Sequence, residues 1–216
     1  MRVPPARTTD ARFRAEEGCG VCFATVEGAS PEDATAHAAG WLALWMAFQK
    51  RCRNAGAAVF DVDDTLLTHR HGGEAPLAPC VALYNRLREL GFACCIVTAR
   101  PDYAQNRDAT VAALRRLGVD GWESLYMMPP PPRGTPCLRT YVSDYKARAR
   151  ADVATRHRLL CSVGDCWHDV LDDATIREPL RRRVAATPVA ACVVCFPGGG
   201  DAGEHMAALK LPNFDA

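Results

Sequence analysis

The sequence predicts an α/β fold with a mostly parallel central sheet of about five strands. Short apolar runs, rich in valine, phenylalanine and cysteine, alternate along the chain with longer segments whose apolar residues recur at helical spacing. Strands that alternate with helices are joined by crossover connections, which pair the strands in parallel. At 216 residues, with 49% hydrophobic residues, the chain is also long enough to bury one sizeable core.

The N-terminal part of the chain is expected to hold an arm and a helix. Residues 1–29 are rich in proline, arginine and glycine without clear periodicity, so we expect an irregular arm. Ser30, Pro31 and Glu32 are typical of a helix start, with an N-cap followed by a proline and an acidic residue. We therefore predict an N-terminal helix over 30–54, whose buried face carries Trp41, Leu42, Leu44, Trp45, Phe48 and Cys52.

The following residues, 57–213, are expected to form the core of a single domain that spans 30–216. The run at 92–98 is continuously apolar, which is typical of a strand buried on both faces. Pro129–Pro132 fit neither a helix nor a central strand and indicate a loop. The alternation predicts a three-layer, Rossmann-like arrangement, with strands at 57–60, 92–98, 124–128, 159–164 and 189–196 and helices at 77–90, 101–117, 142–157 and 167–176.

Composition and charge narrow the class of protein. The formal net charge of +1 provides no general attraction to nucleic acids or anionic membranes. The first residues lack the apolar segment of a secretory signal, and no apolar stretch approaches the roughly 20 residues that span a bilayer. Eleven cysteines, several of them inside apolar runs, are typical of free thiols. We therefore expect a protein of the reducing cytoplasm without a membrane partner.

Polar side chains follow three of the predicted strands at the point where each strand ends. Asp61 and Asp63 come directly after the first strand of the core, Thr98 ends the second, and Asp165 follows the fourth. Because the carboxyl ends of parallel strands meet at one edge of a sheet, these groups are expected to converge. Crowded carboxylates repel one another, and a divalent cation or a phosphoryl group would offset that cost.

Lys146 and Asp169 extend this set. Lys146 lies on the helix that precedes the fourth strand of the core and is one of three lysines in the chain. Asp169 follows Asp165 by four residues, so a helix that begins there would bring both carboxylates to one face. Carboxylates, a hydroxyl and an ammonium in this order can serve phosphoryl transfer through an aspartyl intermediate.

Taken in order, these residues resemble the four motifs of phosphatases in the haloacid dehalogenase (HAD) superfamily. The first motif is Asp61–Thr65, the second contains Thr98, the third is Lys146, and the fourth contains Asp165 and Asp169. The chain is most similar to the subfamily of plant-type acid phosphatases and vegetative storage proteins, subfamily IIIB. Further matches to that group within the core are Val97–Pro101, Arg107 with Thr110, Gly118, Trp122 with Leu125, Tyr145-Lys146 and Lys210–Asn213.

The resemblance implies a HAD-like phosphatase whose reaction begins at the first motif. Asp61 would be the nucleophile that attacks phosphorus and forms an acyl phosphate. Asp63 would protonate the leaving group and then activate water, and its pKa should be raised for that work. An enzyme of this kind hydrolyses phosphomonoesters.

The resemblance also implies a Mg²⁺ cofactor. The ion would be held by Asp61, by the backbone carbonyl of Asp63 and by Asp165. Asp169 would orient the lysine or a metal-bound water, and we count it with the metal site. The transferring phosphoryl group would be held by Thr98 and Lys146.

Arg100 and two loop histidines are further candidates for the site. Arg100 follows Thr98 at the strand edge, where it could bind the substrate or form a surface salt bridge. His69 and His71 lie on the loop after the first motif, over the expected site, where they could contact the substrate or remain solvated.

The chain leaves no room for a full cap domain over the site, because 32 residues separate Asp63 from Cys95. An open site suits a broad range of phosphomonoesters or a phosphate on a macromolecule, and we expect small phosphomonoesters such as nucleotides. A polynucleotide 3′-phosphatase is an alternative that the near-neutral charge disfavours and the basic cluster Arg177–Arg183 favours. A catalytically weak storage or scaffold protein is another, against which the intact Asp61 argues.

Overall fold

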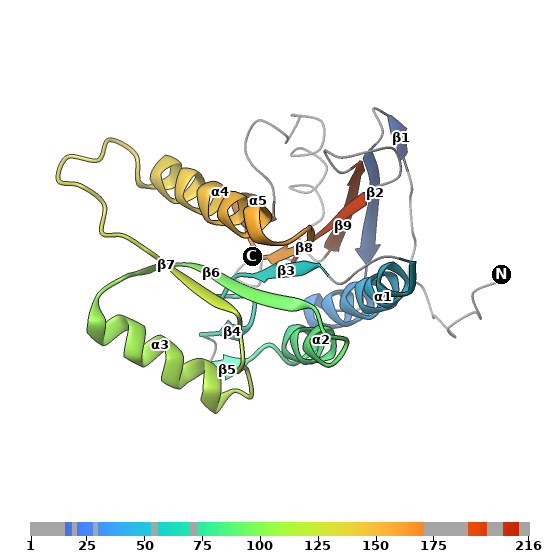
Figure 1. Ribbon diagram of the computed structural model, residues 1–216, viewed down its shortest axis with the longest axis horizontal. Helices are drawn as coiled ribbons and strands as arrows, with labels where there is room; N and C mark the ends of the chain where they lie inside the picture. The colour runs from blue at the N-terminus through green and yellow to red at the C-terminus, as the bar shows by residue number, and fades with distance from the viewer. Residues whose placement is uncertain are drawn as a thin grey trace.

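The computed structural model of the protein describes residues 16–18, 21–27, 30–52, 56–69, 73–170, 190–197 and 205–211. Their main sheet has the strand order β1-β2-β9-β10-β8-β3-β6-β7 (Figure 1). The five strands from β10 to β7 are parallel, which confirms the predicted α/β fold with a five-strand parallel sheet. Their bounds are β3 (Ala57–Phe60), β6 (Ala93–Pro101), β7 (Ser124–Met128), β8 (Leu159–Gly164) and β10 (His205–Lys210).

Three antiparallel strands extend this sheet on one side: β1 (Glu16–Gly18), β2 (Val21–Glu27) and β9 (Ala190–Pro197). The prediction of an irregular arm over 1–29 is therefore wrong for β1 and β2, and the rest of that segment lies outside the described residues. β2 pairs with β9, far away in the sequence, so that Cys22 lies opposite Cys195. Such pairing leaves no local periodicity that would have indicated it.

Helices cover both faces of the sheet, with α4 and α5 above the strands and α1, α2 and α3 below them in Figure 1. The Oγ of Ser30 accepts a hydrogen bond from the N–H of Asp33 at 3.2 Å, so Ser30 caps α1 as expected. None of the described helices is long and apolar enough to cross a membrane. The bounds are α1 (Pro31–Cys52), α2 (Ala78–Glu89), α3 (Ala104–Arg116), α4 (Leu138–Arg156) and α5 (Trp167–Val170).

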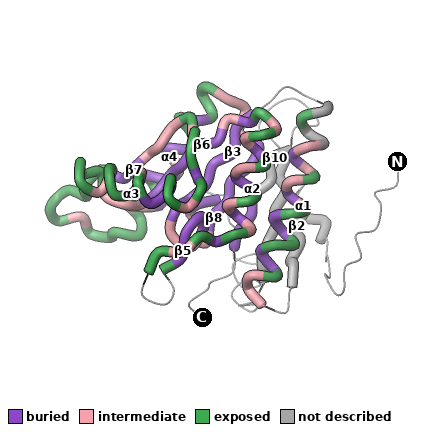
Figure 2. Tube along the Cα trace, turned by 90° about the horizontal axis from the view of Figure 1, so that it is seen from below, coloured by how far each residue is buried: buried purple, intermediate pink, exposed green. Residues whose placement is uncertain are grey.

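The central strands supply two cores at once. Ala58 and Phe60 of β3 belong to the core shared with α1 and α2, whereas Ala57 and Val59 belong to the core shared with α4. The ring of Tyr84 on α2 meets the ring of Phe60 edge-on, with centroids 5.3 Å apart. The tube in Figure 2 accordingly shows β3, β6 and β8 as buried. Burial on both faces explains why these runs are continuously apolar.

The order of the parallel strands places a site at the end of β3. The chain passes from β3 to β6 and β7 on one side and then returns to β8 on the other. Ligands bind at such a switch point, beyond the carboxyl ends of the strands. Between β3 and α2, the described residues form only the small hairpin of β4 (Leu67–Thr68) and β5 (Ala75–Pro76), which is no full cap domain.

Candidate active site

A tight turn at the end of β3 presents the first pair of carboxylates. The carbonyl of Val62 accepts hydrogen bonds from the N–H groups of Leu66 at 2.9 Å and Leu67 at 3.0 Å. Asp64 adopts a left-handed conformation in this turn, with φ of 51°. Aspartate tolerates that conformation better than most residues because its short polar side chain can hydrogen-bond locally. The turn thus reverses the chain within a few residues of Asp61.

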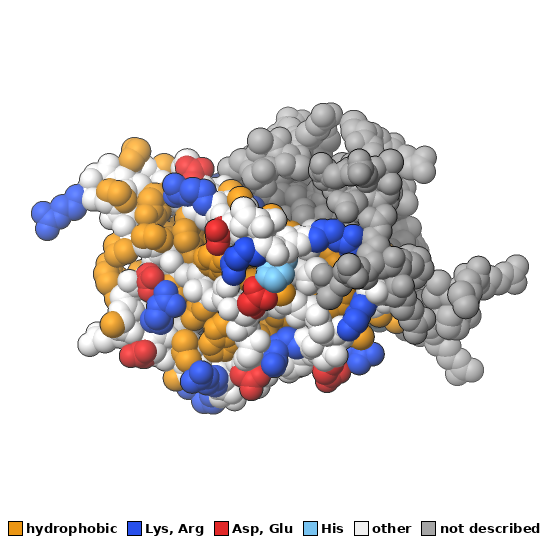
Figure 3. Space-filling model, viewed as in Figure 1, with side chains coloured by type: hydrophobic (Ala, Val, Ile, Leu, Met, Phe, Trp, Pro, Cys, Tyr) orange, Lys and Arg blue, Asp and Glu red, His pale blue; other side chains and the backbone are white. Residues whose placement is uncertain are grey.

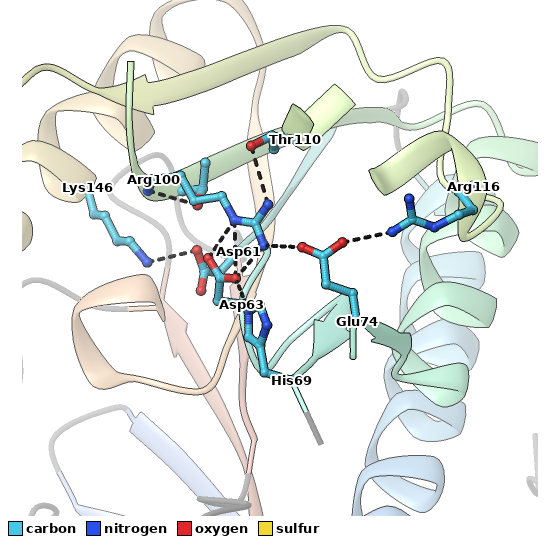
Figure 4. A network of polar contacts seen from close by, with 9 residues as sticks. Asp61, Asp63, His69, Glu74, Arg100, Thr110, Arg116 and Lys146 are labelled. Carbon is cyan, nitrogen blue, oxygen red and sulfur yellow. Dashed lines mark hydrogen bonds and ion pairs between the residues drawn. The ribbon is translucent and has the colours of Figure 1, made fainter. Parts of the chain in front are cut away.

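Lys146 of α4 places a buried cation next to the carboxyl end of β3. Its Nζ donates a hydrogen bond to Oδ1 of Asp61 at 2.9 Å and is also in close contact with Oδ1 of Asp169. Figure 4 shows the Lys146 side chain pointing from its helix toward Asp61. All three side chains are less than a tenth exposed. The structure therefore brings together three of the predicted residues, although 85 positions separate Lys146 from Asp61.

Asp165 completes an oxygen-lined cluster. One carboxylate oxygen each from Asp61, Asp165 and Asp169 lies within 4.8 Å of the other two. Asp169 is oriented by the N–H of Cys166, which donates to its Oδ2 at 2.8 Å. Hard carboxylate oxygens are the ligands that Mg²⁺ prefers. Since the three carboxylates outnumber the ammonium groups of Lys146 and Lys210, both of which act on Asp165, the remaining negative charge fits a divalent cation.

The glycine at the end of β8 is required for this arrangement. A Cβ placed on Gly164 would collide with the side chain of Asp169, which folds back over the strand end. The predicted pair Gly164-Asp165 thus has a physical reason: the glycine makes room for the second carboxylate of the motif. Asp169 lies in α5, which begins at Trp167, two residues later than a helix starting at Asp165.

Burial sets the electrostatics of the cluster. Burial, together with the charges of Asp169 and Asp165, raises the pKa of Asp61 well above its usual range, although Lys146 opposes this. Burial and the charge of Asp169 raise the pKa of Asp165 to about 6. Burial lowers the pKa of Lys146, but the carboxylates of Asp61 and Asp169 raise it by more than burial lowers it. The amine is therefore held as an ammonium. A bound cation would favour the ionised carboxylates.

Asp63 differs from the prediction. Burial raises its pKa, but hydrogen bonds from Arg100 and His69 outweigh burial and hold the pKa below its ordinary value. Nη2 of Arg100 donates to Oδ1 of Asp63 at 2.7 Å and Nε donates to Oδ2 at 3.0 Å. The Nε2 atom of His69 lies 2.9 Å from Oδ1 of Asp63. The expectation of a raised pKa is therefore wrong for this conformation, because sequence spacing did not reveal that Arg100 and His69 contact Asp63.

Arg100, whose side chain contacts Asp63, lies at a register shift in β6. The strand continues past Thr98, where we had expected it to end, and its pairing with β7 is irregular between Thr98 and Pro101. The hydroxyl of Thr98 is buried and accepts the N–H of Arg100 at 3.2 Å. Arg100 is thus engaged with a carboxylate of the site, and a role for Thr98 or Arg100 in binding phosphate stays a prediction.

Glu74 and Arg116 form an outer part of this network, which the sequence analysis missed. Glu74, just before β5, accepts hydrogen bonds from Arg100 at 3.3 Å and from Arg116 of α3 at 2.8 Å (Figure 4). Arg100 also donates to Oγ1 of Thr110 at 3.3 Å. Thr110 is one of the matches to the family to which the sequence assigns no role, and no local pattern identifies Glu74. His71 lies outside the described residues.

The surface around these elements has mixed charge. On the face shown in Figure 3, acidic and basic side chains alternate over the described part of the chain. Arg107, for example, pairs with Asp102 through two hydrogen bonds of 2.9 and 2.8 Å. Such a face presents no continuous basic strip of the kind that follows a nucleic-acid backbone. The basic cluster Arg177–Arg183 lies outside the described residues.

Comparisons with known proteins agree with this geometry. Residues 68–213 match the family described as HAD superfamily, subfamily IIIB (acid phosphatase). Among solved structures, the class C acid phosphatase from Bacillus anthracis is similar in fold, with a TM-score of 0.52, 17% sequence identity and 72% of each chain covered. A comparison with curated proteins produces no match. The family match begins after Asp61 and Asp63, so the contact between Asp61 and Lys146 comes from the structure and not from the family match.

Proposed function

The chain belongs to the acid phosphatases of HAD subfamily IIIB, and we propose that it hydrolyses small phosphomonoesters, such as nucleotides, in a Mg²⁺-dependent reaction through a phosphorylated Asp61. One observation carries the proposal: the carboxylate of Asp61 lies at the sheet's switch point, 2.9 Å from the buried ammonium of Lys146. A nucleophile beside a fixed cation is suited to attack a phosphoryl group, because the cation offsets repulsion between the two anions.

The reaction proceeds in two displacements. An Oδ of Asp61 attacks phosphorus, the bond between phosphorus and the leaving oxygen breaks, and the leaving oxygen takes a proton from Asp63. In the second displacement, Asp63 recovers a proton from a water molecule whose oxygen attacks the same phosphorus. The acyl phosphate bond then breaks, which releases inorganic phosphate and restores Asp61.

Asp63 has to change partners in this cycle. The hydrogen bonds that it accepts from Arg100 favour the carboxylate, and a carboxylate has no proton to donate. A substrate phosphate that draws the Arg100 guanidinium away from Asp63 would let Asp63 take up the proton that the leaving group needs. Arg100 would then be both a phosphate ligand and a control on the acid.

Asp61, Asp165 and Asp169 would hold the Mg²⁺ ion, with the backbone carbonyl of Asp63 as a further ligand. When bound, the ion would neutralise carboxylate and phosphate charge and fix the orientation of the phosphoryl group. The mixed-charge face supports small, soluble substrates over a nucleic-acid end.

The test replaces the nucleophile without changing its size. Asp61→Asn should lower phosphate release from an aryl phosphate by at least about 1,000-fold, because the amide cannot form the acyl phosphate. Asp108→Asn, the same change at an exposed position of α3, is the matched control and should leave the rate unchanged. EDTA should silence the wild type and added Mg²⁺ should restore it. Turnover by Asp61→Asn within tenfold of the wild type would refute the covalent mechanism.

The substrate class needs its own assay. We expect the values of kcat/KM for nucleoside monophosphates and sugar phosphates to exceed the value for an oligonucleotide with a 3′-phosphate. The reverse order, with a steep loss of oligonucleotide hydrolysis as salt rises, would show a polynucleotide 3′-phosphatase instead.

A further inference from the structure

A second group of metal-ligating side chains overlaps the acidic cluster. Sγ of Cys166, a ring nitrogen of His168 and a carboxylate oxygen of Asp169 all lie within 4.8 Å of one another. Asp169 belongs to both groups, whereas neither Cys166 nor His168 has a part in the proposed reaction. We propose that Cys166, His168 and Asp169 form a binding site for a soft divalent cation such as Zn²⁺, and that this cation inhibits the enzyme.

The donor atoms select the kind of ion. Thiolate, imidazole and carboxylate are the three ligand types of protein zinc sites, and a water molecule commonly completes the tetrahedron. Mg²⁺ disfavours sulfur and nitrogen, so it should prefer the all-oxygen group of Asp61, Asp165 and Asp169. The two overlapping groups are therefore matched to two different classes of cation.

The distances allow an ion to enter with small movements. Three atoms that are at most 4.8 Å apart all lie within about 2.8 Å of one common point, whatever the shape of their triangle. Zinc bonds are about 2.3 Å to sulfur and about 2.0–2.1 Å to nitrogen. Each donor atom would thus have to move by less than about 1 Å. As the bond to sulfur forms, the Cys166 thiol loses its proton to the buffer.

The backbone around this group is already held in place. Arg150 of α4 donates a hydrogen bond to the carbonyl of His168 at 2.6 Å, and the N–H of Cys166 holds Asp169 at 2.8 Å. The His168 side chain is 20% exposed, whereas the Asp169 side chain is almost fully buried. An ion could therefore arrive from solvent along the imidazole and bind the carboxylate from that side.

Because both groups of ligands contain Asp169, a cation in the second group should inhibit the phosphatase reaction. Oδ1 of Asp169 contacts Lys146 and lies 3.6 Å from Nε2 of His168. A cation bound between His168 and Asp169 would face the Lys146 ammonium, and the two positive charges would repel each other. The ion would thus draw Asp169 away from Lys146 and from the Mg²⁺ ligands. This consequence, unlike the binding itself, rests on the proposed phosphatase function.

Binding can be tested without turnover. Equilibrium dialysis of the metal-stripped full-length chain against Zn²⁺ should show a site that is lost, or weakened at least about tenfold, in both Cys166→Ser and His168→Gln. Cys137→Ser removes an exposed cysteine elsewhere and should bind Zn²⁺ like the wild type. Circular dichroism spectra would verify that each variant is folded. Equal Zn²⁺ stoichiometry and affinity in the wild type and both variants would overturn the site.

A kinetic measurement tests the inhibition. Zn²⁺ should inhibit phosphate release by the wild type and by Cys137→Ser, and the concentration for half-inhibition should rise at least about tenfold in Cys166→Ser. The same half-inhibition in all three proteins would overturn the regulatory role. Since dialysis does not depend on turnover, a failed phosphatase assay would leave the binding result interpretable.

Discussion

Asp63 and Asp165 are carboxylates of one site, yet their pKa values move in opposite directions. Burial acts on both, but Asp63 faces the guanidinium of Arg100 while Asp165 faces the carboxylate of Asp169. The pKa of Asp63 is therefore lowered, and that of Asp165 is raised to about 6. Neighbouring charge, more than position in the motif, decides which carboxyl holds a proton.

The Arg100 contact predicts a pH effect. In Arg100→Gln, the loss of the cation should raise the pKa of Asp63, so its acid form should persist to higher pH. Since kcat/KM falls as a required acid loses its proton, the alkaline limb of the pH profile should move upward by about one unit. Arg86→Gln, which removes an exposed guanidinium paired with Glu89, serves as the control. An unchanged limb in Arg100→Gln would mean that Asp63 is not the acid.

At the level of elements, the site depends on how β8 ends. The strand stops at Gly164, and the chain then turns through Asp165 and Cys166 into the short α5. Asp169 returns over the strand end, where only a residue without a Cβ leaves room for it. The α4 helix closes the same corner by directing Lys146 inward. Strand end, turn and two helices therefore form one unit of the site.

A substitution at Gly164 should displace the Asp169 carboxylate without removing it. Gly164→Ala should push Asp169 away from Lys146 and lower kcat by about 100-fold, since a displacement of about 1 Å can have that effect. Gly40→Ala, in α1, meets no atom within 4 Å and should be stabilising by about 0.5–1 kcal/mol with full activity. Activity of Gly164→Ala within threefold of the wild type would contradict the proposed packing.

Over the whole molecule, the site forms only when the sheet is assembled. Asp61 comes from β3, Lys146 from α4, and Asp165 from the end of β8, and these segments meet only when the parallel strands are assembled. The fold therefore confines two buried carboxylates and the partly buried Asp165 beside the ammonium of Lys146. Such confinement costs stability while no cation is bound, because the unfolded chain would hydrate the same charges.

This cost predicts how the stability of the metal-free protein depends on pH. In EDTA, the folded form of Asp165 has a pKa of about 6 against 3.8 for the free side chain, so it retains a proton that the unfolded chain has lost. The free energy of unfolding should therefore fall as pH rises from about 4 to about 6. Asp165→Asn lacks this term and should be more stable than the wild type at pH 7.5 by about 1–3 kcal/mol, with no advantage at about pH 3.

Urea unfolding at the two pH values would measure the difference. Mg²⁺ should act in the other direction: at about 100 times its dissociation constant, it should stabilise the wild type by about 2.7 kcal/mol and Asp165→Asn much less. A variant that is no more stable than the wild type in EDTA at pH 7.5 would contradict the raised pKa of Asp165.

Local patterns were enough to predict most of the parallel sheet. The runs at 57–60, 92–98 and 159–164 are central strands, and their continuous apolar character follows from burial on both faces. The strand β10 and the pairing of β2 with β9 escaped prediction. The antiparallel pairing of β9 with β2 and β10 joins segments from the two ends of the chain, and its free energy depends on neighbours that periodicity does not report.

The alternation of apolar runs with helical segments was sufficient to predict the fold class. The order of Asp61, Thr98, Lys146 and Asp165 along the chain was sufficient to predict the family and one edge of the sheet as the site, because parallel strands bring their ends together. The tertiary structure alone decided that Arg100 pairs with Asp63, 37 positions away. It also decided that Asp169 is shared by two groups of ligands. Contacts of this kind depend on where a bulge or a turn directs a side chain, and they become stronger as folding removes water from around the charges.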